Sequence, residues 1–259
     1  MNILIISSKE DKASINLKKR LFENYSLEQK EDFYFLKSNG INNIYFKEIE
    51  KQHIYSSEEE MIPKSLQIDQ IIVLSKHSTL SEIKTKTITA HSIGNWGKAE
   101  LGGKDKTLVK TDPILIRELL FNLKKNKPTK IKEYEVKQEA THHGPYLDIS
   151  TMFVEIGSSD PDWENKDVAN YIIQILINIL INYNREDIKK TRNWVEAIGI
   201  GGNHYCTKFN KKTFKNSNLF CFGHIIPSYA LKDVNNNPEI LEEAKEKSNS
   251  NIIIYNKDL

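Results

Sequence analysis

Cysteine is scarce in this sequence. The 259 residues include two, Cys206 and Cys221, and they form no CxxC pair. The sequence therefore does not indicate a disulfide framework, and we expect a cytoplasmic protein in a reducing compartment. The net charge is also small, +2 at pH 7. Because this balance does not demand a nucleic-acid partner, such a partner has to be argued from local patches.

Long apolar segments are missing as well. The longest apolar stretch, residues 168–181, is too short to cross a bilayer and carries three side-chain amides. The N-terminal residues 2–6 have no preceding basic segment and no cleavage signature, so we interpret them as a first strand and not as a secretion signal. We expect no contact with a membrane.

What the sequence does contain is an alternation of apolar strands and helices. Hydrophobic residues make up 39% and charged residues 28%, which is typical of a soluble globular protein. We expect strands at residues 2–6, 33–36, 43–48, 70–75, 85–89, 131–140, 152–156, 194–200, 219–222 and 252–255, and helices at 13–24, 113–125, from 160 onward and at 238–247. This order predicts an α/β fold with a mixed, mostly parallel sheet covered by helices on both faces. With no internal repeat and no clear boundary, we predict a single domain over residues 1–259.

The stretch Glu139-Ala-Thr-His-His-Gly-Pro145 is the centre of the functional prediction. Adjacent residues of a strand point to opposite faces, so His142 and His143 can reach one site only if the chain turns there. Gly144 and Pro145 favour such a turn. A second strand followed by glycines and a histidine, ending at His204, repeats the pattern downstream.

Histidines also follow other predicted strands. Just past a predicted strand end lie His77, His91, His142, His204 and His224. Sites of open α/β sheets form at the carboxyl ends of the strands, so this placement favours a catalytic centre there. For each histidine alone, an ordinary loop position is the competing interpretation.

A zinc site is the chemistry that these residue types favour. His142, His143 and His204 supply imidazoles, and Glu155 brings a carboxylate into an apolar strand. No compact motif such as HExxH is present, so spacing alone does not fix the ligands. Glu139 and Glu155 are equally compatible with general bases or with carboxylates that orient an imidazole.

Three further features surround these histidines. Gly201 and Gly202 allow a close backbone approach and offer N–H groups to a developing oxyanion, or they simply form a tight turn. Cys206 is a candidate nucleophile that nothing in the sequence positions. Residues 205–215 interleave lysines with aromatic side chains, which suits phosphates and stacked bases, so Tyr205, Lys208 and Lys211 are candidate RNA contacts. A solvated charged face is the alternative for this segment.

Several blocks occur in one order along almost the whole chain. They are Ser7-Ser8 with Asp11, Ala90-His-Ser-Ile-Gly-Asn95, Glu139–Pro145, Glu155-Ile-Gly-Ser-Ser159, Gly199-Ile-Gly-Gly with His204-Tyr205, and Gly223-His-Ile with Pro227. Together they resemble the archaeal and plant type of D-aminoacyl-tRNA deacylase. The resemblance implies a zinc-dependent hydrolase acting on the tRNA 3′ end, and a fold similar to peptidyl-tRNA hydrolases and nucleoside phosphorylases. It also makes His91 a candidate substrate contact.

The mechanism expected from this reasoning begins with a zinc held by some of His142, His143, His204 and Glu155. The metal lowers the pKa of a bound water, hydroxide attacks the ester, and the N–H groups near Gly201 stabilise the oxyanion. A wall that rejects the L side chain enforces chirality. Two alternatives remain: another enzyme on this fold, such as a peptidyl-tRNA hydrolase or a phosphorylase, and a non-catalytic RNA-binding module. We expect a monomer.

Overall fold

The computed structural model describes residues 1–79, 84–215 and 219–256. The chain forms two compact units, each assembled from three segments. The first unit comprises residues 1–89, 122–136 and 153–183, and the second comprises 90–121, 137–152 and 184–259. Because the six segments alternate, the chain passes between the units five times. This division into two compact units does not test whether the chain is one domain, so the single domain over residues 1–259 stays a prediction.

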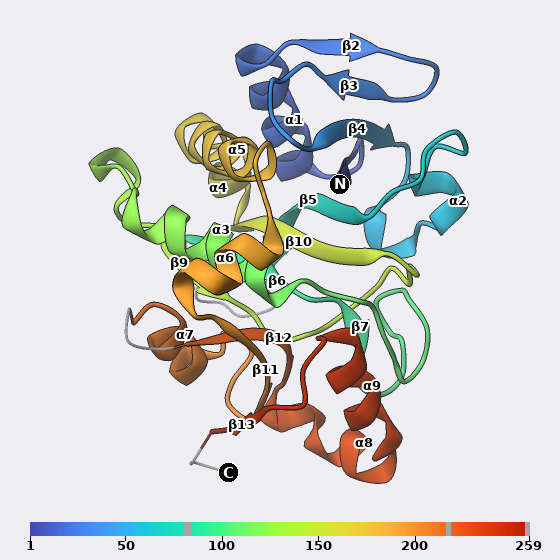
Figure 1. The fold of residues 1–259 in the computed structure, drawn as a ribbon, viewed down its shortest axis with the longest axis vertical. Coiled ribbons are helices and arrows are strands. Elements are labelled where there is room, and N and C mark those ends of the chain that lie inside the picture. Colours follow the sequence, from blue (N-terminus) through green and yellow to red (C-terminus); the bar gives the residue numbers. More distant parts are fainter. Residues whose placement is uncertain (80–83, 216–218, 257–259) are drawn as a thin grey trace. The chain divides into compact units, whose positions relative to one another are not determined.

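The first unit is built on a large sheet (Figure 1). Its strand order is β2-β3-β4-β1-β5-β10-β6-β9. The strands are β1 Asn2–Ser8, β2 Leu27–Gln29, β3 Tyr34–Leu36, β4 Asn43–Ile49, β5 Gln70–Ser78, β6 Thr87–His91, β9 Glu135–Gln138 and β10 Ser150–Ser158. The central strand β1 is parallel to β4 and β5, whereas β2, β3 and β4 pair antiparallel at one edge. The apolar strand 2–6 thus forms the centre of the sheet, with Ile3 to Ile6 fully buried.

Except for the third, the helices of this unit begin at capping side chains. They are α1 Lys12–Asn24, α2 Glu58–Met61, α4 Asp160–Trp163 and α5 Lys166–Leu180. Asp11 accepts the Ser14 N–H at 2.8 Å at the start of α1. The single helix predicted from residue 160 onward is wrong: the Asn165 side chain accepts the N–H groups of Asp167 and Val168, so it ends the short first helix and begins α5.

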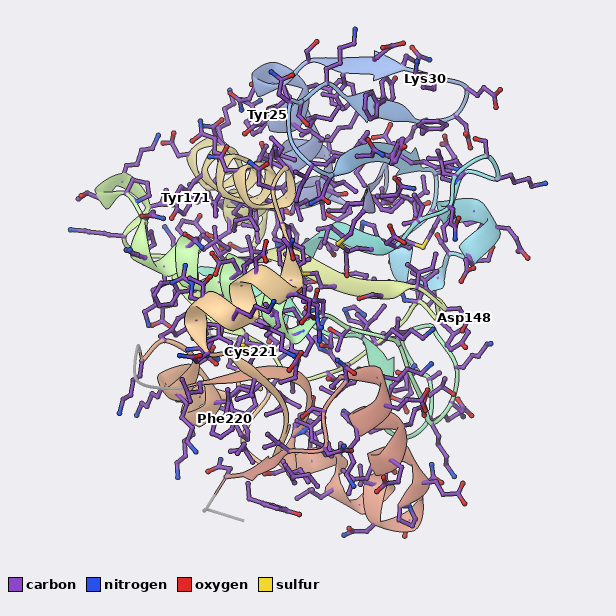
Figure 2. The ribbon with its side chains drawn as sticks, viewed as in Figure 1. Tyr25, Lys30, Asp148, Tyr171, Phe220 and Cys221 are labelled. Atoms are coloured by element: carbon purple, nitrogen blue, oxygen red, sulfur yellow. The ribbon has the colours of Figure 1, made fainter. Side chains whose placement is uncertain are left out.

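The second unit has a smaller parallel sheet of β12 Phe220–Ile226, β11 Val195–Ile200 and β13 Ile253–Tyr255, in that order. A short antiparallel pair, β7 Gly94–Asn95 and β8 Thr107–Leu108, accompanies it. Its helices are α6 Arg185–Arg192, α7 Thr207–Thr213, α8 Leu231–Asn236 and α9 Glu239–Lys247; α3 Pro113–Lys125 lies mostly in this unit. Figure 2 shows the side chains that fill both units and labels Cys221, which is free and buried like Cys206.

The mixed, mostly parallel sheet flanked by helices is confirmed, and most predicted elements are present. Four boundaries differ in ways that affect the histidines. Strand β5 extends through His77, β6 ends on His91, β12 extends through His224, and β9 ends at Gln138, four residues before His142. Helices α2, α6, α7 and α8 were not predicted. Among the described residues, no helix has both the length and the apolar character needed to cross a membrane.

Candidate functional site

The turn after Ala140 brings two adjacent imidazoles to one side of the chain. His143 has a left-handed backbone, φ +47°, and its ring centroid lies 4.4 Å from that of His142. A Cβ added to Gly144 would lie 2.3 Å from the Gly103 nitrogen. Since no side chain fits in that space, glycine is required there by the close approach of the two backbone segments. The predicted turn is therefore present, with His143 and Gly144 as its bend.

Backbone hydrogen bonds fix this turn within the second unit. The Ala140 N–H donates to the His204 carbonyl at 2.8 Å, and the Thr141 N–H donates to the Ile225 carbonyl at 3.0 Å. On the other side, the Gly94 N–H donates to the His143 carbonyl at 2.9 Å. The histidine turn is thus held by the segment that follows β11, by strand β12 and by the segment that follows β6.

Four imidazoles form one cluster. His91, the last residue of β6, stacks on His142 with ring centroids 4.3 Å apart and contacts His143 at 5.1 Å. The His204 ring contacts His142 edge-on at 4.5 Å. His91 is fully buried, whereas the side chains of His142 and His204 are 22% and 32% exposed. The cluster can therefore be reached from solvent on the side of His142 and His204.

The protonation of three of these rings is set by backbone carbonyls. Nδ1 of His142 lies 2.8 Å from the Ala140 carbonyl, Nδ1 of His143 lies 2.6 Å from the Gly144 carbonyl, and Nδ1 of His91 lies 3.1 Å from the Ser92 carbonyl. A carbonyl oxygen only accepts, so Nδ1 carries the proton in each ring. The neutral rings then have their lone pairs on Nε2. Metal-binding histidines commonly show this arrangement.

Electrostatics favour the neutral form at His142. Burial lowers the pKa of His142 well below its usual value, and the neighbouring rings of His91, His143 and His204 lower it further, against the opposing effect of Glu139. Neutral imidazoles are the form that binds a metal ion. His91, His142 and His143 each offer a ligand atom, and these atoms lie within 4.8 Å of one another. The donor set therefore suits a zinc ion.

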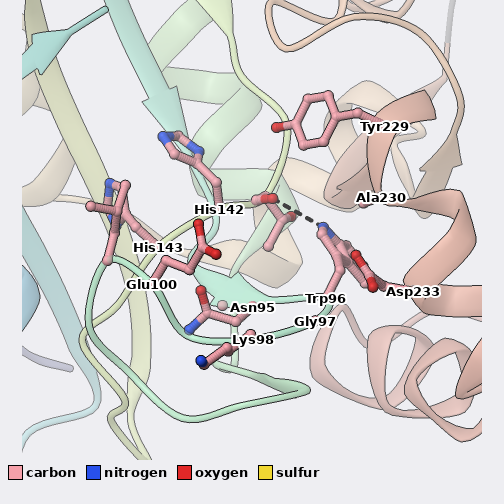
Figure 3. Close-up of a pocket in the computed structure, with 13 residues that line it drawn as sticks. Asn95, Trp96, Gly97, Lys98, Glu100, His142, His143, Tyr229, Ala230 and Asp233 are labelled. Carbon is pink, nitrogen blue, oxygen red and sulfur yellow. Dashed lines mark hydrogen bonds between the residues drawn. The ribbon is translucent and has the colours of Figure 1, made fainter. Parts of the chain in front are cut away.

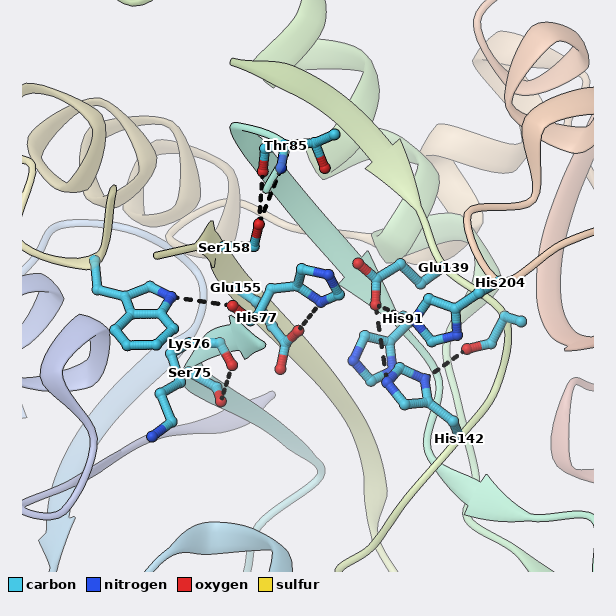
Figure 4. Close-up of polar contacts among 12 residues, drawn as sticks. Ser75, Lys76, His77, Thr85, His91, Glu139, His142, Glu155, Ser158 and His204 are labelled. Carbon is cyan, nitrogen blue, oxygen red and sulfur yellow. Dashed lines mark hydrogen bonds and ion pairs between the residues drawn. The ribbon is translucent and has the colours of Figure 1, made fainter. Parts of the chain in front are cut away.

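Glu139 adds a buried carboxylate to the cluster (Figure 4). Its Oε2 atom lies 3.3 Å from Nε2 of His204 and 3.8 Å from Nε2 of His142, and the Glu139 side chain is fully buried. The other nitrogen of His204, Nδ1, lies 3.2 Å from the Tyr229 hydroxyl. Glu139, His204 and Tyr229 thus form a continuous line of polar contacts that ends on an exposed tyrosine.

A cavity of about 390 Å³ opens beside the cluster (Figure 3). Its lining includes the His142 and His143 rings on one side, and Tyr229 and Asp233 on the other. The Trp96 indole also lines it and donates to the Thr141 carbonyl at 3.0 Å. Trp96, Tyr229 and Asp233 could not be identified as site residues from the sequence, because they stand at no diagnostic spacing from a histidine.

Glu155 and His224, two further predicted residues, have buried partners of their own. In the first unit, Glu155 on β10 pairs with His77 on β5, with Oε2 and Nδ1 3.4 Å apart and both side chains buried (Figure 4). The catalytic role of Glu155 stays a prediction. In the second unit, His224 donates from Nε2 to the Val109 carbonyl at 3.0 Å, and its Nδ1 accepts the Thr141 hydroxyl at 3.1 Å. His224 is therefore a buried structural histidine.

Gly201 and Gly202 have positive φ angles of 99° and 93° and form a tight turn after β11. The Gly201 N–H donates to the Ile226 carbonyl at 2.7 Å, and the Gly202 N–H donates to the Ser228 hydroxyl at 2.9 Å. Both donors are engaged inside the protein, which argues against the expected oxyanion hole at these two groups. The turn instead ties β11 to the segment that carries Tyr229.

Most of the lysine-aromatic segment, residues 205–215, forms helix α7. On α7, Lys208 and Lys211 are exposed, whereas Phe209 is buried and packs edge-on against Phe222 with ring centroids 4.9 Å apart. The alternation of lysines and aromatics is thus that of an amphipathic helix. Tyr205 and Phe214 remain partly exposed, and the Lys137 ammonium lies 4.7 Å from the Tyr205 ring centroid.

Cys206 is a poor nucleophile in this structure. Its side chain is buried at the start of α7, where the thiol points to the His204 carbonyl at 3.6 Å. Burial raises the pKa of the Cys206 thiol well above its usual value, and Glu139 raises it further. Because the thiolate is the reactive form, the thiol is held in its unreactive state.

Comparison with known proteins gives one consistent result. Residues 64–259 match a family model described as D-aminoacyl-tRNA deacylase. A Picrophilus torridus protein named D-aminoacyl-tRNA deacylase is 35% identical over 253 residues, covering 97% of this chain and 88% of the relative, and a Pyrococcus abyssi protein of the same name is 36% identical, covering 88% and 80%. A solved structure described as a conserved protein of unknown function matches with a TM-score of 0.82 at 26% identity, covering 100% of this chain and 86% of its own.

Proposed function

Because this chain belongs to the D-aminoacyl-tRNA deacylase family, we propose that it hydrolyses the ester between a D-amino acid and the 3′ end of tRNA. The observation that carries the proposal is the cluster of His91, His142 and His143, whose Nδ1 protons are held by backbone carbonyls beside an open cavity. An ester hydrolase needs groups prepared in advance at a site that the substrate can enter. Free tRNA and the D-amino acid are the products.

Zinc is part of this proposal. We assign His91, His142 and His143 as its ligands, and so exchange His204 of the expected set for His91. His204 is turned to other partners, since its Nε2 faces Glu139 and its Nδ1 faces Tyr229. When bound, zinc supplies a Lewis acid for the ester carbonyl and lowers the pKa of a water molecule.

Glu139 serves the cluster through its negative charge. Nε2 of His142 bears a lone pair, because Nδ1 holds the proton, yet it lies only 3.8 Å from a Glu139 oxygen. Two electron-rich atoms at this distance favour a cation or a shared proton near them. Toward His204, a Glu139 oxygen lies 3.3 Å from Nε2, so the carboxylate is a close neighbour of that ring as well.

The exposed lysines of α7 are the proposed contacts for the tRNA backbone. Lys208 and Lys211 lie on the same exposed helix face, and Tyr205 precedes that helix with a partly exposed ring. Lysines bind phosphates through charge, without reading sequence. This fits an enzyme whose substrate is defined by the aminoacyl end. A cytoplasmic location and a monomeric state complete the proposal.

The test compares D-tyrosyl-tRNA with L-tyrosyl-tRNA as substrates of the purified protein, with and without a chelator. We expect hydrolysis of the D form, loss of activity on chelation and recovery with zinc. His142→Ala should lose both activity and bound zinc while its circular dichroism stays unchanged. D-selective hydrolysis that survives chelation would refute the zinc assignment and leave the function standing. Hydrolysis of neither form would refute the function itself.

A further inference from the structure

A buried side-chain amide joins the two segments that carry Glu139 and His204, and we propose that this residue, Asn210, is a positioning residue for the deacylation. Asn210 lies on α7 and is 7% exposed. One of its partners, Gln138, directly precedes Glu139. The other, Tyr205, directly follows His204. The inference rests on the proposed function and deepens it, because it names what holds two groups of the site at a fixed separation.

The Asn210 amide satisfies three backbone groups at once. Its Oδ1 accepts the Gln138 N–H at 2.7 Å, and its Nδ2 donates to the Gln138 carbonyl at 2.8 Å. Nδ2 also donates to the Tyr205 carbonyl at 2.7 Å. This pattern needs an acceptor and two donor protons, which a side-chain amide has, whereas a carboxylate has no proton and a hydroxyl has one. The three bonds therefore explain why asparagine stands at this position.

Glu139 lies between two cross-links to the segment that carries His204. On one side of it, Gln138 is bound to Asn210. On the other side, the Ala140 N–H donates to the His204 carbonyl at 2.8 Å. Between these cross-links, Oε2 of the fully buried Glu139 side chain lies 3.3 Å from Nε2 of His204. Because a shift of about 1 Å in a group of an active site can cost about 100-fold in rate, this separation has to be held by the chain.

The turn that leads from His204 into α7 also depends on Asn210. Cys206 has a left-handed backbone, φ +49°, which is unfavourable for a residue with a Cβ. Such a conformation persists only where the surrounding contacts hold it. The Asn210 N–H donates to the Cys206 carbonyl at 2.8 Å, while its side chain binds the carbonyl of Tyr205. Asn210 therefore holds both residues that connect His204 to the helix.

The same helix carries the proposed tRNA contacts. Lys208 and Lys211 are exposed, whereas Asn210, which lies between them in the sequence, is buried. Loss of the amide leaves both lysines on the helix. A positioning role therefore predicts a change in kcat, with KM for the tRNA substrate near its wild-type value.

The experiment is a double-mutant cycle of Asn210→Ala and Glu139→Gln, with kcat and KM measured for D-tyrosyl-tRNA. The matched control is Thr213→Val on the same helix. Thr213 is fully buried and its hydroxyl has no hydrogen-bond partner among the described residues, so valine, which has nearly the same shape, removes no bond. Hydrogen exchange of the Ala140 N–H is measured in every protein as a second readout. If Asn210→Ala does not fold, Asn210→Asp takes its place, because it keeps the acceptor for the Gln138 N–H and loses the two donated bonds.

We expect Asn210→Ala to lower kcat by about tenfold or more and to change KM by less than about twofold. In the Glu139→Gln background the same substitution should lower kcat by less than about twofold, because the carboxylate that it positions is already absent. The Ala140 N–H should exchange about tenfold faster or more, since its bond to His204 has lost the neighbouring cross-link. Thr213→Val should leave all three quantities unchanged.

The comparison of the two backgrounds decides the matter. Equal losses of kcat in both would overturn the positioning role and leave Asn210 as a residue that only supports the fold. Unchanged kinetics, or a rise in KM with kcat unchanged, would overturn it as well. A wild-type protein that does not hydrolyse D-tyrosyl-tRNA would refute the proposed function itself and the positioning role with it, a result that is seen before any substitution is made.

Discussion

His224 makes the stability of this protein depend on pH, and the size of the effect follows from its surroundings. Burial lowers the pKa of His224 from 6.5 to about 3, partly offset by its hydrogen bond to the Val109 carbonyl. A folded pKa below the unfolded one means that the unfolded chain binds the proton more readily. Stability is therefore lost as the pH falls below about 6.5, and the loss grows until the pH reaches about 3.

The magnitude at pH 5 is worked out from these two values. At pH 5 the solution is about 1.5 units below the unfolded pKa of His224 and well above its folded pKa. Since each unit corresponds to about 1.4 kcal/mol, His224 lowers the free energy of unfolding by about 2 kcal/mol relative to pH 7.5. With a urea dependence of about 2 kcal/mol per molar, the unfolding midpoint falls by about 1 M. His142 and His53 also have lowered pKa values from burial and add to the total loss.

The assay is urea unfolding, followed by tryptophan fluorescence at pH 5 and 7.5 in the presence of a chelator, which removes any pH-dependent metal binding. His224→Gln keeps a donor toward the Val109 carbonyl and does not titrate. From pH 7.5 to pH 5, the free energy of unfolding should fall by about 2 kcal/mol less in the variant than in the wild type, because the other histidines contribute equally to both proteins. An identical pH dependence in the two proteins would refute the argument.

Further predictions concern the site. Glu139→Gln should keep the fold and lower kcat/KM by about 10- to 100-fold, because it removes the negative charge beside His142 and His204; an unchanged rate would exclude a role for that charge. Replacing Lys208 and Lys211 together by Ala should raise KM for the tRNA substrate. It should also reduce the salt dependence of tRNA binding by the amount expected for the loss of about two phosphate contacts, whereas replacing the exposed Lys19 by Ala should do neither. Cys206→Ser should retain deacylation at near wild-type rates, since the buried thiol is not the nucleophile; loss of activity with zinc binding intact would contradict this.

Much of the fold could be predicted because apolar patterning and caps act locally. The helix predicted at 113–125 has those bounds in the structure, since proline at its first position and the preceding capping residue are short-range signals. The helix that begins at Thr207 was missed because aromatic and lysine residues in a short segment also match a surface loop. Its helical character depends on Phe209 packing against Phe222, which is distant in the sequence.

The candidate site divides in the same way. The turn at His142 and His143 could be predicted, because glycine and proline next to two histidines have few structural solutions. The place of His91 in the cluster could not, since it results from β6 ending beside the histidine turn. His224 shared the same sequence pattern as His204, yet its strand continues past it and places it in the core. Whether a histidine lies within a strand or just past its end depends on how that strand pairs with residues that are distant in the sequence.

The order in which the chain is made gives the histidine turn a further property. Its anchors, the carbonyls of His204 and Ile225, are synthesised 60 or more residues after the turn itself. Since chains emerge from the ribosome at about 5–20 residues per second, the turn waits several seconds before it can be fixed. A nascent chain shorter than about 225 residues therefore lacks the arrangement that prepares the imidazoles. Chains left by translation that stalls before Ile225 would therefore be inactive.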